Sequence, residues 1–320
     1  MFVPKDMRFS VIIPLYNKAP YVCKALESVA SQSFQNFELV VVDDGSKDGS
    51  GDIAASFLAT TSLIYQHIRQ KNAGVSTARN HGVASSNGEY ICFLDADDWW
   101  EPAFLEHMDA FIRDYPEAGI YGTNYYYVKN GQKRICVEAL ETGYIHYCKA
   151  YACHLQMPLW TGAVCIPRGV FDEMGGFRPH LKLGEDFDLW IKIALKYKVA
   201  FLNEPLSNYY QDSDATWRGV GHLVNPAYHM LWNLDYLSHE ERINPDYKQL
   251  IDNLRTYSLL PYFLSRQWHK EAQEELDKVD WKLQPARTHN LYNCPVWYLR
   301  LRHSFLSLGS KVKQWLIQSL

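Results

Sequence analysis

Apolar runs alternate with amphipathic segments along the first hundred residues. The runs are short, rich in Val, Ile, Leu and Phe, and end at polar residues, a pattern typical of strands buried on both faces of a parallel sheet. The segments between them carry apolar residues at helical spacing. Such alternation predicts a parallel sheet with right-handed crossovers. The predicted strands are 9–13, 39–42, 63–66 and 90–94, and the predicted helices are 20–31, 51–60 and 75–84.

The alternation becomes less regular after residue 100, and from about residue 221 the pattern is helical only. We therefore predict an α/β domain over residues 1–215 and a helical C-terminal extension over residues 216–320. Asn130-Gly131, between two β-type runs, indicates a hairpin turn. The further predicted strands are 119–128, 133–138, 162–167 and 199–202, and the further predicted helices are 101–115 and 185–198.

The composition fits a folded protein with a large core. Of 320 residues, 47% are hydrophobic and 21% charged, and ordinary numbers of Gly and Pro exclude disordered and collagen-like classes. Seven cysteines without a C-x-x-C pair argue against a zinc site or a disulfide framework and favour a reducing compartment. No run reaches the roughly 18 apolar residues that a membrane span needs. We expect a cytoplasmic protein, either soluble or peripheral on the inner face of the cytoplasmic membrane.

Charge is unevenly distributed along the chain. Residues 281–320 contain six basic and no acidic side chains, whereas the preceding 280 residues contain 26 basic and 36 acidic ones. The acidic body excludes a nucleic-acid partner. Residues 296–320 mix Trp and Leu with basic residues, a composition typical of helices that lie on an anionic membrane surface. Packing of the same apolar faces on the preceding helices is the alternative interpretation.

Polar and aromatic groups follow three of the predicted strands. They are Pro14-Leu15-Tyr16-Asn17, Asp43-Asp44-Gly45-Ser46 and Asp95-Ala96-Asp97-Asp98. Ligands of open parallel sheets bind beyond the carboxyl ends of the strands, so these groups are expected to share one rim. One such motif alone is compatible with a simple turn and helix cap. Three motifs on one rim favour a ligand site.

Asp95 and Asp97 are candidate metal ligands. They stand two positions apart after an apolar run, and hard cations such as Mn²⁺ or Mg²⁺ prefer carboxylates together with substrate phosphate oxygens. Unpaired, the neighbouring carboxylates would repel one another, which favours a bound cation over a solvated turn.

Two further constellations carry candidate chemistry. In Lys71-Asn72-Ala73-Gly74, the glycine opens a helix whose N-terminus can face a phosphate or a base, and Lys71 or Arg79 could neutralise a diphosphate. A capped helix with a surface arginine explains these residues equally well. Glu185-Asp186 opens a second helix, where both acids could be dipole partners only. A carboxylate on a rigid helix below a glycine-containing loop is also well placed as a general base.

Taken together and in this order, the constellations resemble the family 2 glycosyltransferases with the GT-A fold. The matching stretches are VIIPLYNKAPYVCKALESVASQSFQNFELVVVDDGSKDGS, NAGVSTARNHGVASSNGEYICFLDADDWW and GGFRPHLKLGEDFDLW. The resemblance covers residues 8–215. It implies a mostly parallel central sheet flanked by helices, and an inverting transfer of a sugar from a nucleotide-sugar to a hydroxyl group. A role in bacterial polysaccharide or O-antigen assembly, with a glycan or polyprenyl-diphosphate-linked glycan as acceptor, is what it implies most often.

The resemblance also implies roles for single residues. In the nucleotide-sugar site, Asp43 would accept a hydrogen bond from the uracil of a UDP-sugar, Asp95 would contact the ribose, and Asp97 would hold Mn²⁺ or Mg²⁺, with Asp95 beside it. The whole implied donor site is Pro14, Tyr16, Asp43, Asp44, Lys71, Asn72, Arg79, Asp95 and Asp97.

On the acceptor side, Asp186 would deprotonate the acceptor hydroxyl, and Glu185 and Trp190 would lie near the acceptor. The chain departs from the family in one place. Many relatives carry a His after the last sheet strand, whereas Tyr209-Tyr210-Gln211-Asp212 stands here, so that Asp212 would substitute or the role would be vacant.

Other function classes share parts of the pattern. Phospho-acceptor receiver domains place their acidic pair after the first strand, whereas here it follows the second. A nucleotidyltransferase would carry a Gly-rich loop where Tyr16-Asn17-Lys18 stands. A non-catalytic nucleotide- or glycan-binding protein with the GT-A fold is the main alternative, and Asp97 and Asp186 argue against it. Sugar selectivity is expected within residues 119–127 and 155–162, which do not identify the sugar.

Overall fold

The computed structural model describes residues 7–212 and 223–301. It divides the chain into two compact units, Met1–Met230 and Leu231–Leu320. The predicted domain boundary at 215/216 lies outside the described residues. So do residues 302–320 of the predicted membrane-binding segment 296–320.

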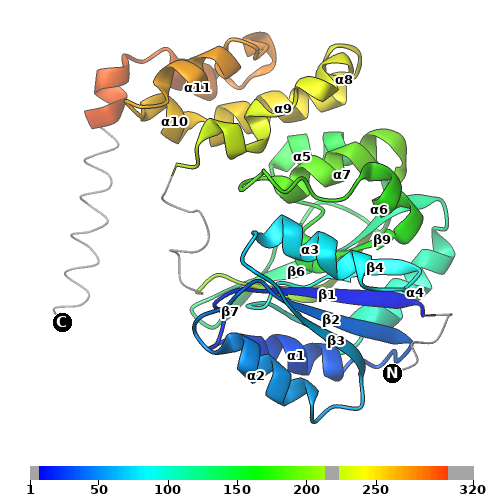
Figure 1. Cartoon of the computed structure of the whole chain (residues 1–320). Helices are drawn as coiled ribbons and strands as arrows, with labels where there is room; N and C mark the ends of the chain where they lie inside the picture. The colour runs from blue at the N-terminus through cyan, green and yellow to red at the C-terminus, as the bar shows by residue number, and fades with distance from the viewer. Residues whose placement is uncertain (1–6, 213–222, 302–320) are drawn as a thin grey trace. The chain divides into compact units, whose positions relative to one another are not determined.

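The first unit is built on one mixed sheet (Figure 1). Within the described residues its strand order is β3-β2-β1-β4-β9-β6-β10-β5, with β7 paired to β6 and β8 paired to β10. The strands are β1 (Phe9–Leu15), β2 (Phe37–Asp43), β3 (Ile64–Arg69), β4 (Tyr90–Phe93), β5 (Trp99–Trp100), β6 (Ala118–Lys129), β7 (Gln132–Ile135), β8 (Gly143–Ile145), β9 (Val164–Pro167) and β10 (Lys198–Tyr210).

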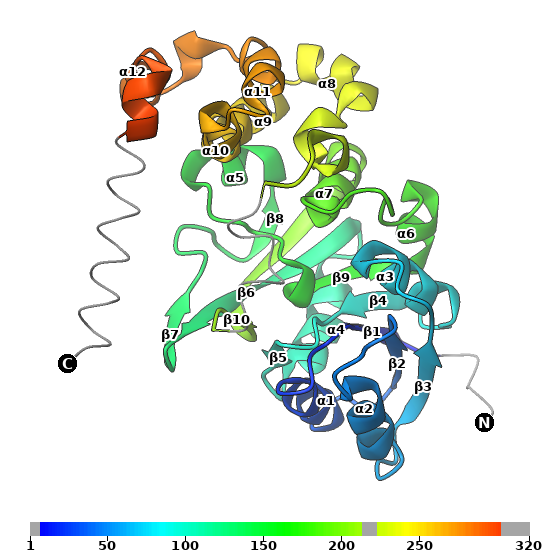
Figure 2. The ribbon, with the colours of Figure 1, turned by 60° about the vertical axis from the view of Figure 1, so that its left-hand side comes forward.

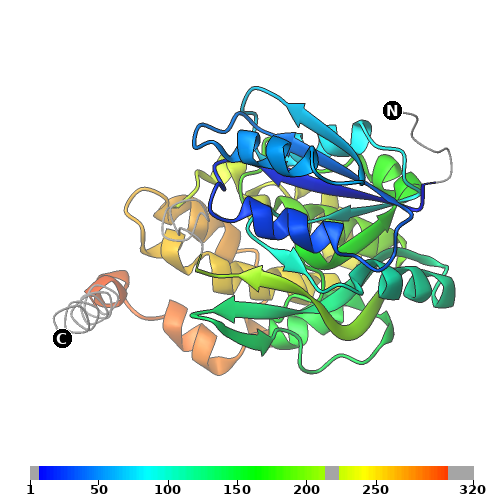
Figure 3. The same ribbon diagram turned by 90° about the horizontal axis from the view of Figure 1, so that it is seen from below.

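The helices of this unit cover both faces of the sheet. Helices α1 and α2 lie on one face, and α3, α6 and α7 lie on the other (Figures 1 and 3). The helices, with η for 3₁₀ turns, are α1 (Val22–Ala30), α2 (Ser50–Leu58), α3 (Val75–Ala84), α4 (Phe104–Asp114), α5 (Tyr147–His154), η1 (Thr161–Ala163), α6 (Arg168–Met174), α7 (Glu185–Lys196) and η3 (Pro226–Tyr228).

The predicted strand–helix alternation is confirmed. Strands β1 to β4 are mutually parallel in the order β3-β2-β1-β4, and all seven residues of β2 are buried, as its continuous apolar run predicts. The antiparallel strands β5 and β8 and the helices α5 and α6 were not predicted. Strand β10 was predicted to end at Leu202, but it continues to Tyr210 through register shifts on both sides of Pro205. Such irregularities accommodate a proline, which has no N–H to donate.

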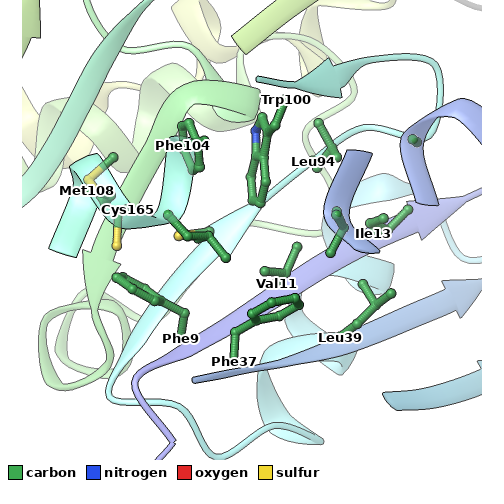
Figure 4. Packing of buried hydrophobic residues seen from close by; sticks show 14 of the residues in the cluster. Phe9, Val11, Ile13, Phe37, Leu39, Leu94, Trp100, Phe104, Met108 and Cys165 are labelled. Atoms are coloured by element: carbon green, nitrogen blue, oxygen red, sulfur yellow. The ribbon is translucent and has the colours of Figure 1, made fainter. Parts of the chain in front are cut away.

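The main core lies between β1, β2 and β4 and the helices α1, α2 and α4. Alternate residues of β1, such as Val11 and Ile13, face this core, where Trp100 stacks on Phe104 with ring centroids 4.1 Å apart (Figure 4). The intervening residue Ile12 faces α3 instead, because successive side chains of a strand point to opposite faces. Burial on both faces holds the carboxyl ends of β1, β2 and β4 in fixed positions.

The strands on the two sides of β4 differ in length. Strands β6 and β10 are the longest, and Figure 2 shows β6 continuing with β7 as a hairpin beyond the central strands. The hairpin turn at Asn130-Gly131 is confirmed, with both residues at positive φ.

The second unit is helical in all its described elements, which confirms the predicted helical extension. Its centre is Arg255, 1% exposed, which pairs with Glu241, with Glu275 at 3.3 Å and with Asp252 at 3.4 Å. Breaking one pair of such a buried set leaves an uncompensated charge, so these ion pairs hold α8, α9 and α11 together. The elements are η4 (Met230–Trp232) at the junction, then η5 (Asp235–Leu237), α8 (Ser238–Ile243), α9 (Pro245–Ser258), α10 (Leu260–Leu264), α11 (His269–Leu276), η6 (Trp281–Leu283) and α12 (Ala286–Tyr292).

None of the helices described here is both long and apolar enough to span a bilayer.

The approach of α3 to the sheet depends on Gly82. A Cβ at this position would lie 2.4 Å from Cγ2 of Ile12 and 3.3 Å from Cγ2 of Val42. We expect Gly82→Ala to lower the free energy of unfolding by about 1–3 kcal/mol through overpacking, measured by urea denaturation. Gly169→Ala in α6 is the matched control, because its Cβ would meet nothing within 4 Å, and it should be neutral or stabilising. Equal midpoints for the two variants would contradict the close approach.

Candidate active site

The three predicted motifs meet at one edge of the sheet. Strands β2, β1 and β4 are neighbours and parallel, so Asp43, Tyr16 and Asp95 follow strand ends that lie side by side. The predicted shared rim is therefore confirmed as an arrangement of the backbone. What each side chain does there depends on its partners.

Asp44 joins two loops of the rim. Its carboxylate, 3% exposed, accepts hydrogen bonds of 2.8 Å from the backbone N–H groups of Ala73 and Gly74 and from the side chain of Gln70. Gly45 lets the loops touch, since a Cβ there would lie 3.0 Å from the backbone nitrogen of Asn72. Asp44 thus shapes the loop, and Lys71 and Asn72 are exposed on it.

Asp43 is fully buried at the end of β2. One carboxylate oxygen accepts the N–H of Ser46 at 2.8 Å, and the other lies 3.2 Å from Nε of Arg69. Pro14 is buried beside it in β1, and Tyr16 is half-buried at the end of that strand. One oxygen of Asp43, the last residue of β2, is therefore committed to the loop, whereas the other is within ion-pair distance of Arg69 but accepts no hydrogen bond from the described residues.

Each acid of the Asp95–Asp98 motif has a partner from another element. Asp95 accepts from Nη2 of Arg79 at 2.8 Å, Asp97 from Nζ of Lys18 at 2.6 Å, and Asp98 from the N–H of Tyr210 at 2.7 Å. The premise that these carboxylates are unpaired is therefore wrong, because these pairings already offset the repulsion. Asp98 is buried and anchors the loop to β10, whereas Asp95 and Asp97 are partly exposed.

Arg79 connects the two halves of the site. It projects from α3, is only 3% exposed, and donates to Asp95 at 2.8 Å and to Glu185 at 3.1 Å. Burial by itself lowers the pKa of Arg79, but the Asp95 and Glu185 carboxylates raise it above its ordinary value. Its guanidinium therefore joins the loop after β4 to the first turn of α7, and its Nε is buried without a hydrogen-bond partner among the described residues.

Glu185 and Asp186 open α7, directly after Gly184 in the left-handed conformation. Asp186 accepts the hydroxyl of Thr161 at 3.1 Å and its neighbour's N–H, that of Phe187, at 2.8 Å. Burial raises the pKa of Glu185 to about 7, the adjacent Asp186 adds to this, and Arg79 opposes it. The two adjacent acids thus have different environments, because Arg79 pairs with Glu185, whereas the Thr161 hydroxyl and the Phe187 N–H bond to Asp186.

Two predicted residues occupy structural positions. Trp190 is fully buried and packs edge-on against Phe177, with ring centroids 5.9 Å apart, so it supports α7 from the core rather than facing an acceptor. The carboxylate of Asp212 accepts the N–H of Asn130 at 2.6 Å in the β6–β7 turn. This contact commits Asp212 to the hairpin and argues against its use as a substitute for the missing His.

Lys18 and Thr161 were not singled out from the sequence. Lys18 was visible as a cation after the first strand, but its contact with Asp97 requires β1 to neighbour β4, which only the sheet order reveals. Thr161 lies in the 155–162 segment assigned to selectivity. The carbonyl of the next residue, Gly162, accepts from Trp100 and Ser207 at 2.7 Å each and so holds η1 in place.

Comparisons with known proteins agree on one family. The family model described as Glycosyl transferase family 2 matches residues 10–153, and that described as Glycosyl transferase family group 2 matches residues 90–221. An uncharacterised glycosyltransferase of Rickettsia typhi is 30% identical over 254 residues, covering 73% of this chain and 74% of the relative. Glycosyltransferase GlyA of Streptococcus pneumoniae is 42% identical over 121 residues, covering 38% of this chain. The chain spans 17% of GlyA and 33% of two further curated relatives.

Solved structures show the same fold. TarS 1–349 of S. aureus, in complex with UDP-GlcNAc, superposes with a TM-score of 0.69 at 20% identity, covering 88% of this chain and 83% of that one. The mannosyltransferase PcManGT of Pyrobaculum calidifontis, in complex with GDP-Man and Mn²⁺, gives 0.55 at 18% identity, covering 97% and 83%. The predicted architecture of a central sheet flanked by helices with a helical extension is confirmed.

The raised pKa of Glu185 makes stability depend on pH. Because the folded-state pKa of about 7 exceeds the ordinary value of 4.5, the stabilising contribution is complete below about pH 4.5 and is lost as the pH rises through 7. Glu185→Gln mimics the neutral form. Its free energy of unfolding, relative to that of the unchanged protein, should rise by roughly 1–3 kcal/mol between pH 5 and pH 8. Thermal unfolding across this range measures it, with Glu27→Gln on the exposed face of α1 as comparison. A stability difference between Glu185→Gln and the unchanged protein that does not vary with pH would contradict the raised pKa of Glu185.

Proposed function

Because this chain belongs to glycosyltransferase family 2, we propose that it transfers a sugar from a nucleotide-sugar to a hydroxyl group of a glycan acceptor, with inversion at the anomeric carbon. The observation that carries the proposal is the bridge formed by Arg79. It brings Asp95, beside the nucleotide loops, to Glu185, beside the candidate base.

Asp186 is the proposed general base. It stands at the first turn of α7, and the Thr161 hydroxyl occupies one of its oxygens at 3.1 Å, which orients the carboxylate. A base in this position takes the proton of the acceptor hydroxyl while its oxygen attacks the anomeric carbon. The diphosphate leaves on the opposite side of the sugar, which accounts for inversion.

The donor is proposed to be a UDP-sugar held by the loops after β1, β2 and β3. Asp43 and Asp44 shape these loops, and the exposed Lys71 and Asn72 are available to the nucleotide. TarS was solved with UDP-GlcNAc and PcManGT with GDP-Man, which supports a nucleotide-sugar but leaves the base and sugar to experiment.

A divalent cation, Mn²⁺ or Mg²⁺, fits the same rim. Asp97 already holds a cationic group, the Lys18 ammonium, at 2.6 Å, and carboxylates are the donors that such hard ions prefer. Asp97, with Asp95 beside it, would hold the ion, which would screen the charge of the leaving diphosphate. In the described part of the chain no three or more His, Cys, Asp or Glu side chains cluster as a metal site, so diphosphate oxygens would complete the ligand set.

A panel of nucleotide-sugars tests the proposal against a non-catalytic binding function. We expect one donor, a UDP-sugar, to be bound and turned over with Mn²⁺ present. Asp186→Asn should bind that donor equally well but transfer or hydrolyse it about 10²–10⁴-fold more slowly, since the amide cannot accept a proton. Asp172→Asn, exposed on α6, is the control. Binding without turnover would favour the non-catalytic function, and full turnover by Asp186→Asn would exclude this residue as the base.

The acceptor is proposed to be a glycan or a polyprenyl-diphosphate-linked glycan, reached from the membrane surface through residues 296–320. Only the start of this tail is described. Its side chains fall into a packed set and an exposed set. Leu299 is buried, and Arg300 donates to the Leu264 and Ser265 carbonyls. Trp297 and Leu301 are more than half exposed. The packed face supports the alternative of core packing, and the exposed face supports membrane contact.

Vesicle binding separates the two roles of the tail. We expect sedimentation with anionic but not neutral vesicles, weakened by salt, because each basic residue near an anionic surface contributes about 1 kcal/mol. Truncation after Leu301 leaves the packed Leu299 and Arg300 in place and should abolish this binding without lowering the melting temperature. Equal sedimentation with both vesicle types, or indifference to the truncation, would leave core packing as the role of the tail.

A further inference from the structure

We propose that Lys18 is a built-in cation of the donor site, which pairs with Asp97 in the empty site and contacts the donor's diphosphate when the donor binds, with or without metal on Asp97. This inference rests on the proposed function. Its basis is the ion pair between Lys18 Nζ and Asp97 Oδ2, 2.6 Å long, with side chains 18% and 12% exposed. The ammonium lies within the motif that follows β4, although its backbone follows β1.

The backbone of Lys18 is held at the rim. The preceding Asn17 has a φ of 52°, its N–H donates to the hydroxyl of Ser46 at 3.2 Å, and its side-chain carbonyl accepts the N–H of Lys47 at 2.8 Å. The carbonyl of Lys18 itself accepts the N–H groups of Tyr21 and Val22, which begins α1. The position of the chain is therefore set, and only the side chain is left to move.

Charge balance gives this side chain its role. An anionic diphosphate must bind at a rim that is rich in acids. These are Asp43, Asp44, Asp95, Asp97, Asp98, Glu185 and Asp186. Arg79 is buried, and its guanidinium is already shared by two carboxylates. Arg69 is paired to Asp43, and Lys71 is exposed on the loop after β3, outside the Asp95–Asp98 motif. Among the described residues, Lys18 forms one ion pair, with the partly exposed Asp97, so its ammonium can be exchanged for a phosphate oxygen.

Lys18 and a divalent cation compete for the same carboxylate. The ammonium has three donors on a flexible stem, whereas the metal needs the Asp97 oxygen itself. If a cation were held by that oxygen, the ammonium would be released beside the phosphates that the cation would screen. Removing the lysine therefore has two opposite effects, because it frees Asp97 for metal and deprives the diphosphate of a cation.

Lys18→Met tests both effects by calorimetry, without turnover. In EDTA we expect the unchanged protein to bind UDP about tenfold more tightly than UMP, and the variant to lose most of this preference, the effect of one hydrogen bond to a charged group. Without nucleotide, the variant should bind Mn²⁺ about two- to fivefold more tightly, because its competitor is gone. Lys47→Met, exposed in the adjacent loop, is the matched control and should change neither value.

Both measurements are needed. If Lys18 merely stabilised the loop, its removal would weaken the binding of both UDP and Mn²⁺. Circular dichroism and the melting temperature verify folding, and Lys18→Gln replaces the methionine variant if that variant does not fold. An unchanged preference for UDP over UMP in EDTA, or unchanged or weaker Mn²⁺ binding, would overturn the inference. If the unchanged protein binds neither nucleotide, with or without Mn²⁺, the proposed donor site fails as well. If UDP binding requires metal in both proteins, the role of Lys18 is overturned but the proposed donor site is not.

Discussion

The guanidinium of Arg79 is the group around which the rest of the site is arranged. It is 3% exposed, and a charge so far from water is tolerated only when it is paired and hydrogen-bonded. Its partners come from the loop after β4 and from the first turn of α7, which are far apart in the chain. Satisfying this one buried charge therefore fixes the spacing between the nucleotide side and the acceptor side of the rim. Burial and the neighbouring Asp186 raise the pKa of Glu185 at this junction.

The other acids of the rim fall into two groups. Asp43, Asp44 and Asp98 are buried and committed to backbone N–H groups nearby, so they shape loops. Asp97 is partly exposed and, among the described residues, is held by the Lys18 ammonium alone, so it is available for exchange. Carboxylates of identical type in one motif thus differ in function because their burial and partners differ. The same distinction separates Arg79, which is fixed by two acids, from Lys18, which has one.

Much of the fold could be predicted from the chain. The apolar runs that became β1, β2 and β4 are buried on both faces, and the helical spacing of the segments between them is equally local information. The antiparallel strands β5 and β8 were missed because two or three residues carry no period. The length of β10 was missed because Pro205 resembles a strand end, and only its pairing with β6 shows that the strand continues. The order of the strands depends on contacts between distant segments.

For the candidate site, the sequence by itself determined which chemical groups follow the strands: acids after β2 and β4, a lysine after β1 and two acids at the start of α7. These are properties of local segments, and the resemblance to one enzyme family rests on them. The tertiary structure decided which of these groups are paired, buried or free to exchange. It placed Arg79 between Asp95 and Glu185, Lys18 on Asp97, Thr161 on Asp186 and Trp190 in the core. Ionisation and availability depend on burial and on partners more than fifteen residues away, and no local pattern encodes these distances.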